Sequence, residues 1–450
     1  MLVFLQLLKY HNNTVRDTNV NNCWTNQTFY TQLLKFAIMS KQALTSFPKE
    51  KINILFLENI SEKAVQQFKQ NGYANVKKIA GALSEDELIK EIKDVHLIGI
   101  RSKTQITHKV LAAAKKLQAI GCFCIGVNQV DIKAASKKGV VVFNAPYSNT
   151  RSVAELVIGI SAMLIRRISD KNIAAHKGIW MKEAKGSFEL RGKTLGLVGY
   201  GNIGSQVSVL AEAIGMKVMF HDSETKLPLG NAIPAKNLKE LLSASDIVSL
   251  HVPETAQTKN LINKTNLKYF KKGALLLNYA RGEVVDLKAL AEAIKDGLIG
   301  GAGIDVFPVE PEKNGDAFTT PLQGLPNVIL TPHIGGSTEE AQQNIGEDVS
   351  IKLFQYLERG ITNGSHSVPS IALPPVEGAH RILHMHNNVP GVLSAINTAL
   401  SKNNINIVGQ YLKTNEDIGY VVLDVDTKLS KRALELLKEV KDTIKVRMLY

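Results

Sequence analysis

Three residues in the second half of the sequence, Arg281, Glu310 and His333, carry side chains that could act together on a small molecule. Each follows an apolar run of the kind that forms a buried strand. An imidazole can accept a proton near neutral pH, and a carboxylate bonded to it fixes its tautomer and raises its pKa. A guanidinium can hold a carboxylate through two parallel hydrogen bonds. These residue types are therefore suited to removing the hydroxyl proton of a small carboxylic acid.

Taken singly, these residues have ordinary explanations. A lone histidine or arginine at a strand end is more often structural, and a lone glutamate is usually a solvated surface charge. The hypothesis of a reactive site depends on the three residues meeting at one sheet edge, beside a place for a cofactor.

A cofactor site is predicted in the stretch Leu195–Gly204, where a short apolar run ends in Gly199, Gly201 and Gly204. The first glycine permits a tight turn, the second lets the backbone approach a pyrophosphate, and the third lets the next helix pack on the strand. The helix that follows directs unpaired N–H groups and the positive end of its dipole at the phosphates. The pattern predicts a strand, turn and helix that bind a dinucleotide.

Asp222 narrows the choice of dinucleotide. It ends a second apolar strand and lies 18 residues after Gly204, near the spacing of the carboxylate that binds a ribose diol. A carboxylate there disfavours a 2′-phosphate, so the sequence favours NAD over NADP. The alternative is a solvated aspartate at a strand end.

Alternating strand and helix patterns place these residues in two α/β lobes. The first lobe extends to about residue 148, and an apolar helix expected over 154–168 is too short to span a membrane. The second lobe is expected to contain six strands in a doubly wound parallel sheet, whose carboxyl ends carry the ligand site. The polar residues that follow these strands are His251, Arg281, Asp305, Glu310 and His333.

The end of the chain has a different pattern. A helix is expected from residue 336 to about 358, followed by a Pro/Ser/Gly-rich linker to about residue 378. The remaining residues show the order β-α-β-β-α-β, which predicts a small ferredoxin-like module.

Composition limits the classes of function. A chain of 450 residues suffices for two or three domains. The net charge of +13 is scattered, with no basic block and no interleaved aromatics, so neither nucleic acid nor a membrane is expected as a partner. The three cysteines are too few for a disulfide framework and show no metal-ligand spacing, which favours a reducing cytoplasm and no metal.

Residues 1–48 form an asparagine-rich extension without the basic region and cleavage site of a signal peptide. We expect translation to start at Met39, with residues 1–38 either disordered or not translated. A targeting or membrane-surface segment is the alternative.

Several stretches together resemble the D-2-hydroxyacid dehydrogenases, most closely the short bacterial members whose chain ends in one ACT domain. The similarity extends from Lys51 to Tyr450. The stretches that carry it are Gly121–Gly126, Asn144–Ser152, Leu250–Pro253, Asn278–Gly282, Ile304–Phe307 with Glu310-Pro311, and Thr331–Thr338. The resemblance implies a substrate-binding domain over 49–148 completed by 336–370, an NAD-binding Rossmann domain over 149–335, and an ACT domain over 379–450.

The activity that the resemblance implies is NAD-linked oxidation of 3-phosphoglycerate to 3-phosphohydroxypyruvate, the first step of serine biosynthesis. His333 would take the proton, Glu310 would support it and Arg281 would hold the carboxylate. The substrate would also contact Arg101, Ser102, Lys103 and Asn149; a lysine at 103, where relatives often carry arginine, keeps the charge but loses the bidentate geometry. The cofactor-binding positions implied are Gly199, Gly201, Asn202, Ile203, Gly204, Asp222, His251, Ala280, Arg281, Asp305, His333, Gly335 and Gly336.

The last module resembles a serine-sensing ACT domain, which implies feedback inhibition by L-serine and a homotetramer. His386, Asn388 and Asn406 match its effector contacts, where amide and imidazole groups can bind a zwitterionic amino acid across a subunit interface. The alternative is that these residues are only polar groups of an interface.

Two other functions stay open. A hydroxypyruvate or glyoxylate reductase would share the site but has no evident need for the ACT module. A corepressor-like protein that senses NAD would share the fold without the activity. Reduction of 2-oxoglutarate is implied as a side activity.

Overall fold

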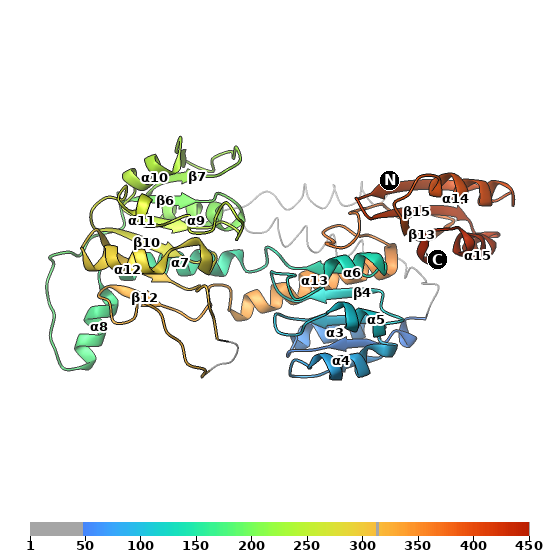
Figure 1. Cartoon of the computed structure of the whole chain (residues 1–450), viewed down its shortest axis with the longest axis horizontal. Helices are drawn as coiled ribbons and strands as arrows, with labels where there is room; N and C mark the ends of the chain where they lie inside the picture. The colour runs from blue at the N-terminus through green and yellow to red at the C-terminus, as the bar shows by residue number, and fades with distance from the viewer. Residues whose placement is uncertain (1–47, 312–314, 450) are drawn as a thin grey trace, which may run out of the picture.

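The computed structural model describes residues 48–311 and 315–449, which form three sheets with their helices (Figure 1). The predictions made for residues 1–48, including a start at Met39, lie outside the described residues except at Pro48. Two parallel-sheet lobes lie side by side along the long axis, and the C-terminal module lies against the first lobe.

The first lobe contains a five-stranded parallel sheet in the order β2-β1-β3-β4-β5. Four of its strands are buried along their whole length, as expected for a parallel sheet covered on both faces. Ser84 and Glu87 form a capping box at the start of α4. The elements are η1 (Lys49–Lys51), β1 (Ile54–Phe56), α3 (Glu62–Gln70), β2 (Val76–Lys78), α4 (Glu85–Glu91), η2 (Ile92–Asp94), β3 (Leu97–Ile100), α5 (His108–Ala113), β4 (Ala119–Cys122), α6 (Ile132–Lys137) and β5 (Val141–Asn144).

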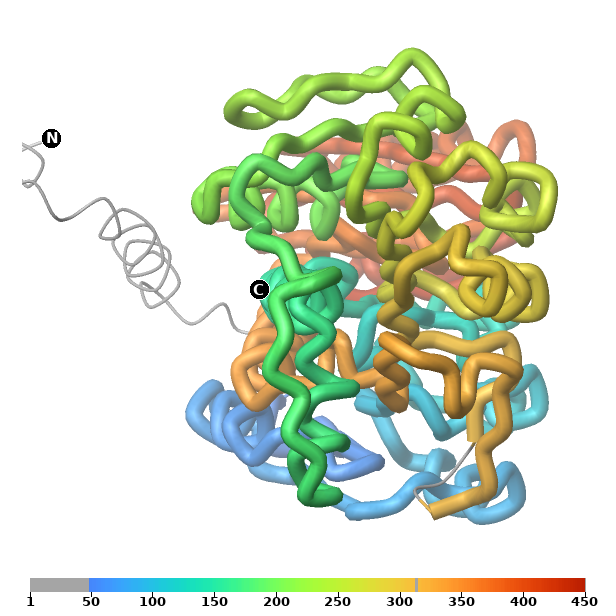
Figure 2. Tube along the Cα trace, turned by 90° about the vertical axis from the view of Figure 1, so that its left-hand side faces the viewer, coloured from blue at the N-terminus to red at the C-terminus, as the bar shows by residue number. Residues whose placement is uncertain are grey.

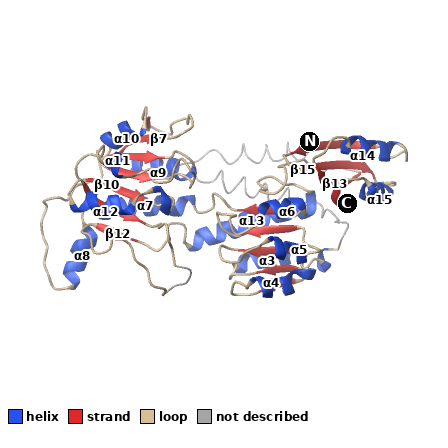
Figure 3. Cartoon of the chain, in the orientation of Figure 1, coloured by secondary structure: helices blue, strands red, loops and turns tan. Residues whose placement is uncertain are grey.

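The second lobe is a doubly wound parallel sheet in the order β12-β11-β10-β9-β6-β7-β8, with helices on both faces (Figure 3). Six strands were predicted here, and the seventh is β8, which has two residues and pairs with β7 at the sheet edge. So short a strand, ending in a proline, has no hydrophobic periodicity to reveal it. The elements are β6 (Thr194–Val198), α9 (Asn202–Ala213), β7 (Lys217–His221), β8 (Ile233–Pro234), α10 (Leu238–Ala244), β9 (Ile247–Leu250), α11 (Lys264–Leu267), β10 (Ala274–Asn278), η3 (Gly282–Val284), α12 (Leu287–Lys295), β11 (Ile299–Ile304) and β12 (Val328–Leu330).

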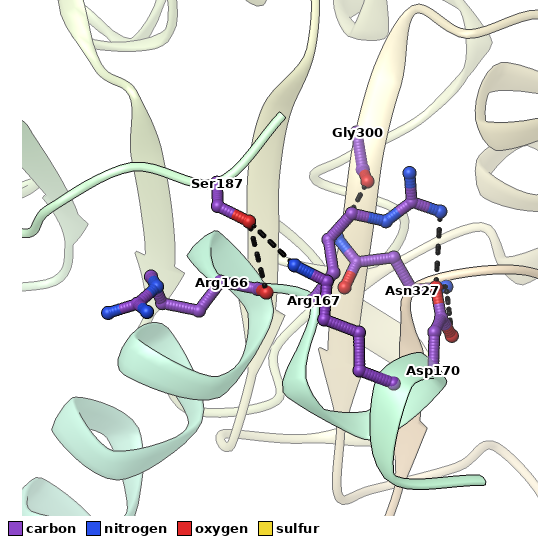
Figure 4. A network of polar contacts seen from close by, with 7 residues as sticks. Arg166, Arg167, Asp170, Ser187, Gly300 and Asn327 are labelled. Atoms are coloured by element: carbon purple, nitrogen blue, oxygen red, sulfur yellow. Dashed lines mark hydrogen bonds and ion pairs between the residues drawn. The ribbon is translucent and has the colours of Figure 1, made fainter. Parts of the chain in front are cut away.

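The apolar helix predicted over 154–168 is α7 (Thr150–Ile165). It ends earlier than predicted because a turn separates it from α8 (Ile168–His176). Arg167 adopts a left-handed conformation with φ 52°, which stops the helix. Asp170 then accepts hydrogen bonds from Arg167 and from the backbone of Asn327 (Figure 4). The Asn327 side chain reaches Gly300 O, so α8 is anchored at the edge of the sheet where β11 and β12 begin.

The segment that follows α8 runs over the outer side of the second lobe (Figure 2). It exposes several large apolar side chains, and Trp180 is 85% exposed. The others are Ile179, Met181 and Phe188. In the described part of the chain, no helix combines the length and apolar character needed to cross a membrane.

The long helix α13 (Glu339–Arg359) leads from the second lobe back onto the first. Thr338 caps its start, and Gly360 ends it with φ 70°. Its apolar face packs on α3, β4 and β5, and Val349 and Leu353 lie in the same buried cluster as Phe56 of β1. The first lobe is therefore built from two segments that are far apart in the sequence.

The C-terminal module is an antiparallel sheet in the order β14-β15-β13-β16 with two helices. Its elements are β13 (Ala379–Asn387), α14 (Val392–Ser401), β14 (Ile407–Thr414), β15 (Ile418–Asp426), α15 (Ser430–Glu439) and β16 (Thr443–Leu449). The order β-α-β-β-α-β is the predicted one. The predicted fold class, two parallel-sheet lobes followed by a ferredoxin-like module, is confirmed.

The module is joined to the end of α13 by hydrogen bonds to backbone carbonyls. Arg447 donates to Tyr356 O at 2.6 Å, Tyr420 to Gly360 O at 2.7 Å and Arg381 to Arg359 O at 3.3 Å. Carbonyls at a helix C-terminus lack partners within the helix and attract cations. The charged and hydroxyl donors of the module therefore cap α13.

Candidate active site

The predicted catalytic residues lie at one edge of the second sheet. Strands β10, β11 and β12 are parallel neighbours, so their carboxyl ends meet. Arg281 follows β10, Glu310 follows β11 and His333 follows β12. The ends of β6, β7 and β9, which lead to the glycine turn, Asp222 and His251, lie along the same edge.

His333 and Glu310 form a direct pair. His333 Nδ1 lies 2.8 Å from Glu310 Oε2, and the two side chains are 50% and 34% exposed. The hydrogen bond to Glu310 raises the pKa of His333 and outweighs the opposing effect of burial. Burial opposes ionisation of Glu310, but hydrogen bonds from His333 and from Phe307 N lower its pKa. The pair can therefore hold a proton on Nδ1 and leave Nε2 as the basic atom.

Asp305 fixes the loop that carries His333. It is 1% exposed, and its carboxylate accepts hydrogen bonds from the Thr331 hydroxyl, Ile334 N and Gly335 N at 2.6, 2.9 and 2.8 Å. His333 N donates to Asp305 O at 2.8 Å, and His333 itself has a left-handed φ of 54°. The predicted cofactor-contacting carboxylate of Asp305 is thus engaged by the His333 loop.

Arg281 lies on the exposed side of this edge, and its positive charge lowers the pKa of both His333 and Glu310. Its backbone is held by Asn278, whose amide donates to Arg281 O at 2.9 Å and accepts from Ala280 N at 3.1 Å. The guanidinium donates to Ala280 O at 2.7 Å. A cation with several donors therefore stands beside the basic pair.

The glycine turn has the shape that a pyrophosphate needs. Gly199 has φ 92°, and a Cβ there would lie 2.4 Å from His251 O. A Cβ on Gly204 would lie 2.2 Å from Gly199 O, whereas one on Gly201 would meet nothing within 4 Å. Only the middle glycine faces open space, at the start of α9, where Asn202 and Ile203 begin the helix. A dinucleotide phosphate fits this opening.

Asp222 and His251 flank the turn. Asp222 accepts hydrogen bonds from Tyr200 N at 2.7 Å and from Glu224 N at 3.0 Å, which anchors its carboxylate at the end of β7. Burial lowers the pKa of His251 to about 3, so its imidazole is neutral. His251 Nε2 pairs with the Ser249 hydroxyl, and Nδ1 is buried without a partner among the described residues.

The predicted substrate residues of the first lobe lie on the loop after β3. Arg101 lines a cavity of about 400 Å³ together with residues at the start of α13. The other lining residues are Ser337, Thr338, Glu339, Gln342 and Gln343. Ser102 and Lys103 are exposed on the same loop.

Asn149 lies where the two lobes meet. A Cβ on Gly336 would lie 2.1 Å from Asn149 Nδ2, so the glycine makes room for this side chain. Close by, the hydroxyls of Ser152 and Thr338 are 2.8 Å apart and connect the starts of α7 and α13. Asn149 and Gly336, both predicted site residues, are therefore in contact.

Sequence reasoning missed Glu58. Its buried carboxylate accepts backbone hydrogen bonds from the loop of Arg101, Lys103 and Thr104. The only signal in the sequence was an acidic residue directly after the apolar run of the first strand.

The predicted effector residues do not meet within one chain. His386 lies at the end of β13 and Asn388 just after it, whereas Asn406 precedes β14. The pairing sets His386 opposite Gly419 and Ile407 opposite Val425, so Asn406 lies near the other end of the sheet. His386 is buried, and Asn388 Nδ2 donates to Asn415 O at 2.7 Å.

The doubly wound sheet, the glycine turn and the His–Glu pair at the strand ends together define a dinucleotide-dependent dehydrogenase. The comparisons with known proteins agree. Residues 158–335 match the D-isomer specific 2-hydroxyacid dehydrogenase, NAD binding domain, and residues 382–445 match the AHAS small subunit-like ACT domain.

D-3-phosphoglycerate dehydrogenase of Haemophilus influenzae is 52% identical over 405 residues, which cover 90% of this chain and 99% of the relative. The enzyme of the same name from Escherichia coli strain K12 is 50% identical over 410 residues, covering 91% and 100%. The solved structure of D-lactate dehydrogenase from Aquifex aeolicus, complexed with NAD and lactic acid, is 28% identical with a TM-score of 0.59 and covers 71% of this chain and 100% of its own.

The chain therefore belongs to the D-3-phosphoglycerate dehydrogenases, within the D-isomer specific 2-hydroxyacid dehydrogenase family. The predicted family, the NAD cofactor and the dehydrogenase class are confirmed.

Proposed function

We propose that the chain oxidises 3-phospho-D-glycerate to 3-phosphohydroxypyruvate with NAD, the first step of L-serine biosynthesis. The observation that carries the proposal is the His333–Glu310 pair, at 2.8 Å, beside Arg281 at the edge that also holds the glycine turn. Family membership supplies the substrate class, since the relatives are D-3-phosphoglycerate dehydrogenases.

In the proposed reaction His333 acts as the general base. Its Nδ1 faces Glu310, so Nε2 takes the proton of the substrate hydroxyl, and the carboxylate stabilises the imidazolium that forms. Asp305 holds the loop so that the imidazole keeps this orientation. The guanidinium of Arg281 binds the substrate carboxylate. NAD, when bound, would accept the hydride from the substrate carbon that carries the hydroxyl.

The phosphate end of the substrate is assigned to the cavity between Arg101 and the start of α13. Lys103 adds a second charge on the same exposed loop. The N-terminal end of a helix also favours an anion. This cavity is therefore suited to a phosphate, whereas the second lobe supplies the base.

The test is an NAD reduction assay with 3-phosphoglycerate, D-glycerate and D-lactate. We expect a clear preference for the phosphorylated acid. Preference for an unphosphorylated acid would contradict the substrate and favour a hydroxypyruvate or glyoxylate reductase. A protein that binds NAD without turning over any of these acids would contradict the enzymatic function.

The ACT module is assigned to serine inhibition within a homotetramer. Because Asn406 lies near the opposite end of the sheet from His386 and Asn388, one small amino acid can touch all three only if two copies pair. The exposed apolar segment around Trp180 offers another surface for a second copy. Together, these two surfaces support a tetramer formed through two kinds of interface.

We expect millimolar L-serine to lower turnover, and Asn388→Ala to weaken this inhibition while basal turnover is retained. Asn403→Ala, on the α14 side of the module, is the matched control. Unchanged rates in serine would contradict the regulatory assignment without touching the catalytic one. A cytoplasmic location stays a prediction.

A further inference from the structure

The loop expected to hold the substrate phosphate has three of its backbone N–H groups bound by one carboxylate, that of Glu58. Strands β1 and β3 are parallel neighbours, and Glu58 follows β1 as the loop Arg101–Thr104 follows β3. The Glu58 carboxylate accepts from Arg101 N at 3.1 Å, Lys103 N at 3.0 Å and Thr104 N at 2.8 Å. Both of its oxygens are used, and Glu58 is 8% exposed.

The turn that carries Glu58 is unusual. Glu58 and Asn59 both have left-handed backbones, with φ 58° and 56°. Residues other than glycine rarely adopt this conformation, and two in succession require support from tertiary contacts. Glu58 N donates to Gly81 O at 3.1 Å, which fixes the turn on its other side. The conformation places the carboxylate beneath the loop of the neighbouring strand.

A second buried residue, Gln129, donates a hydrogen bond to a backbone carbonyl of the same loop. Gln129 is 3% exposed, and its Nε2 donates to Arg101 O at 2.7 Å. Three N–H groups of the loop are thus bound by Glu58, and the carbonyl of Arg101 is bound by Gln129. The three N–H groups bound by Glu58 are therefore already satisfied by the protein, and the loop can offer a ligand only its side chains and its remaining backbone groups.

We propose that Glu58 is a positioning residue for phosphate recognition: by binding these three N–H groups it fixes the loop so that Arg101 and Lys103 aim their charges at the substrate phosphate. This inference rests on the proposed function, because it needs a phosphorylated substrate. It assigns a role to a carboxylate that does not touch the substrate.

The sign of the effect separates positioning from simple electrostatics. Glu58→Gln removes a negative charge near a bound anion, so the loss of Coulomb repulsion alone predicts tighter phosphate binding and a lower KM. The amide of the glutamine, however, places a donor where a backbone N–H must be accepted, which loosens the loop. Positioning therefore predicts a higher KM.

The experiment measures kcat and KM for 3-phosphoglycerate, D-glycerate and NAD in the full chain and its variants. We expect Glu58→Gln to raise the KM for 3-phosphoglycerate about 10-fold, short of the roughly 100-fold cost of a 1 Å misplacement. The KM for NAD and the kinetics with D-glycerate should hardly change. Hydrogen exchange at the amides of residues 101–104 should become faster. Glu62→Gln, in an exposed pair with Lys78, is the matched control.

Glu58→Asp retains the charge but shortens the side chain, so we expect a smaller rise in KM; it carries the test if the glutamine variant does not fold. An unchanged or lower KM for 3-phosphoglycerate would overturn the proposal, as would an equal loss of kcat for every substrate. A wild-type enzyme without preference for the phosphorylated acid would instead overturn the proposed function, and the Glu58 role with it.

Discussion

Both parallel-sheet lobes place a buried carboxylate under a loop at the carboxyl end of a strand, but the two loops differ in what they carry. Asp305 binds Ile334 N and Gly335 N and thereby fixes the loop of His333. Glu58 binds three N–H groups of the loop that presents Arg101 and Lys103. One loop carries an imidazole, which can accept and release a proton, whereas the other carries a guanidinium and an ammonium group.

The second lobe also has a second carboxylate, Glu310, which is hydrogen-bonded to the reactive side chain of His333. In the described part of the first lobe, no second carboxylate is hydrogen-bonded to Arg101 or Lys103. Glu310 raises the pKa of His333, while Glu58 reaches only backbone groups of its loop. Both lobes therefore position a loop with a buried carboxylate, and in the described residues the His333 loop also has a carboxylate that raises the pKa of its reactive side chain. Disturbing the second lobe should therefore lower kcat, and disturbing the first should raise KM.

The largest effect is expected from His333→Ala. Loss of the general base should lower kcat about 1,000-fold or more, within the usual contribution of acid–base catalysis. Affinity for NAD, measured by fluorescence titration, should stay nearly unchanged, because the glycine turn and Asp222 are untouched. His108→Ala, at the exposed start of α5, is the control. Equal turnover in the His333 variant would remove it as the base and end the contrast between the lobes.

Asp305→Asn should have the next largest effect. The amide retains the shape but opposes one of the N–H donors, so the His333 loop shifts and kcat should fall about 100-fold. The KM for 3-phosphoglycerate should change much less than in Glu58→Gln, because the Arg101 loop is intact. Steady-state kinetics, with thermal unfolding to account for lost stability, measure this; Asp296→Asn at the end of α12 is the control. A rise in KM at constant kcat would mean that Asp305 positions a substrate-binding group and not the base.

The sequence was enough to predict the sheets and the edge where the chemistry lies. Buried parallel strands appear in the sequence as apolar runs, and the polar residue that follows each run lies at the edge of the sheet where the strands have their carboxyl ends. Arg281, Glu310 and His333 could therefore be grouped before any coordinates were known. The glycine turn could also be predicted, because Gly199 and Gly204 leave no room for a Cβ and Gly201 leaves open space at the start of the helix.

What the sequence could not predict depends on contacts between distant segments. Glu58 meets backbone groups more than forty residues away, and no local pattern marks an acceptor for them. Asp305 was predicted as a cofactor contact from the family resemblance, and no local pattern shows that its oxygens also bind the His333 loop. The break at Arg167 depends on a left-handed φ supported by Asp170 and Asn327, which is also a tertiary effect.

The smallest effect, and the one that best isolates tuning from positioning, is expected from Glu310→Gln. Oxidation needs neutral His333, so the rate rises with pH as the imidazolium loses its proton. Because the hydrogen bond to Glu310 raises the pKa of His333, its loss should move this rise to lower pH. The plateau of kcat/KM should also fall about 10-fold, since the weaker base is less well oriented. Profiles of kcat/KM against pH, recorded with one substrate for wild type, Glu310→Gln and the exposed control Glu292→Gln, measure both effects. A midpoint that stays in place would mean that Glu310 only positions the imidazole, as Asp305 does, and the two lobes would then differ in nothing but the side chains that their loops carry.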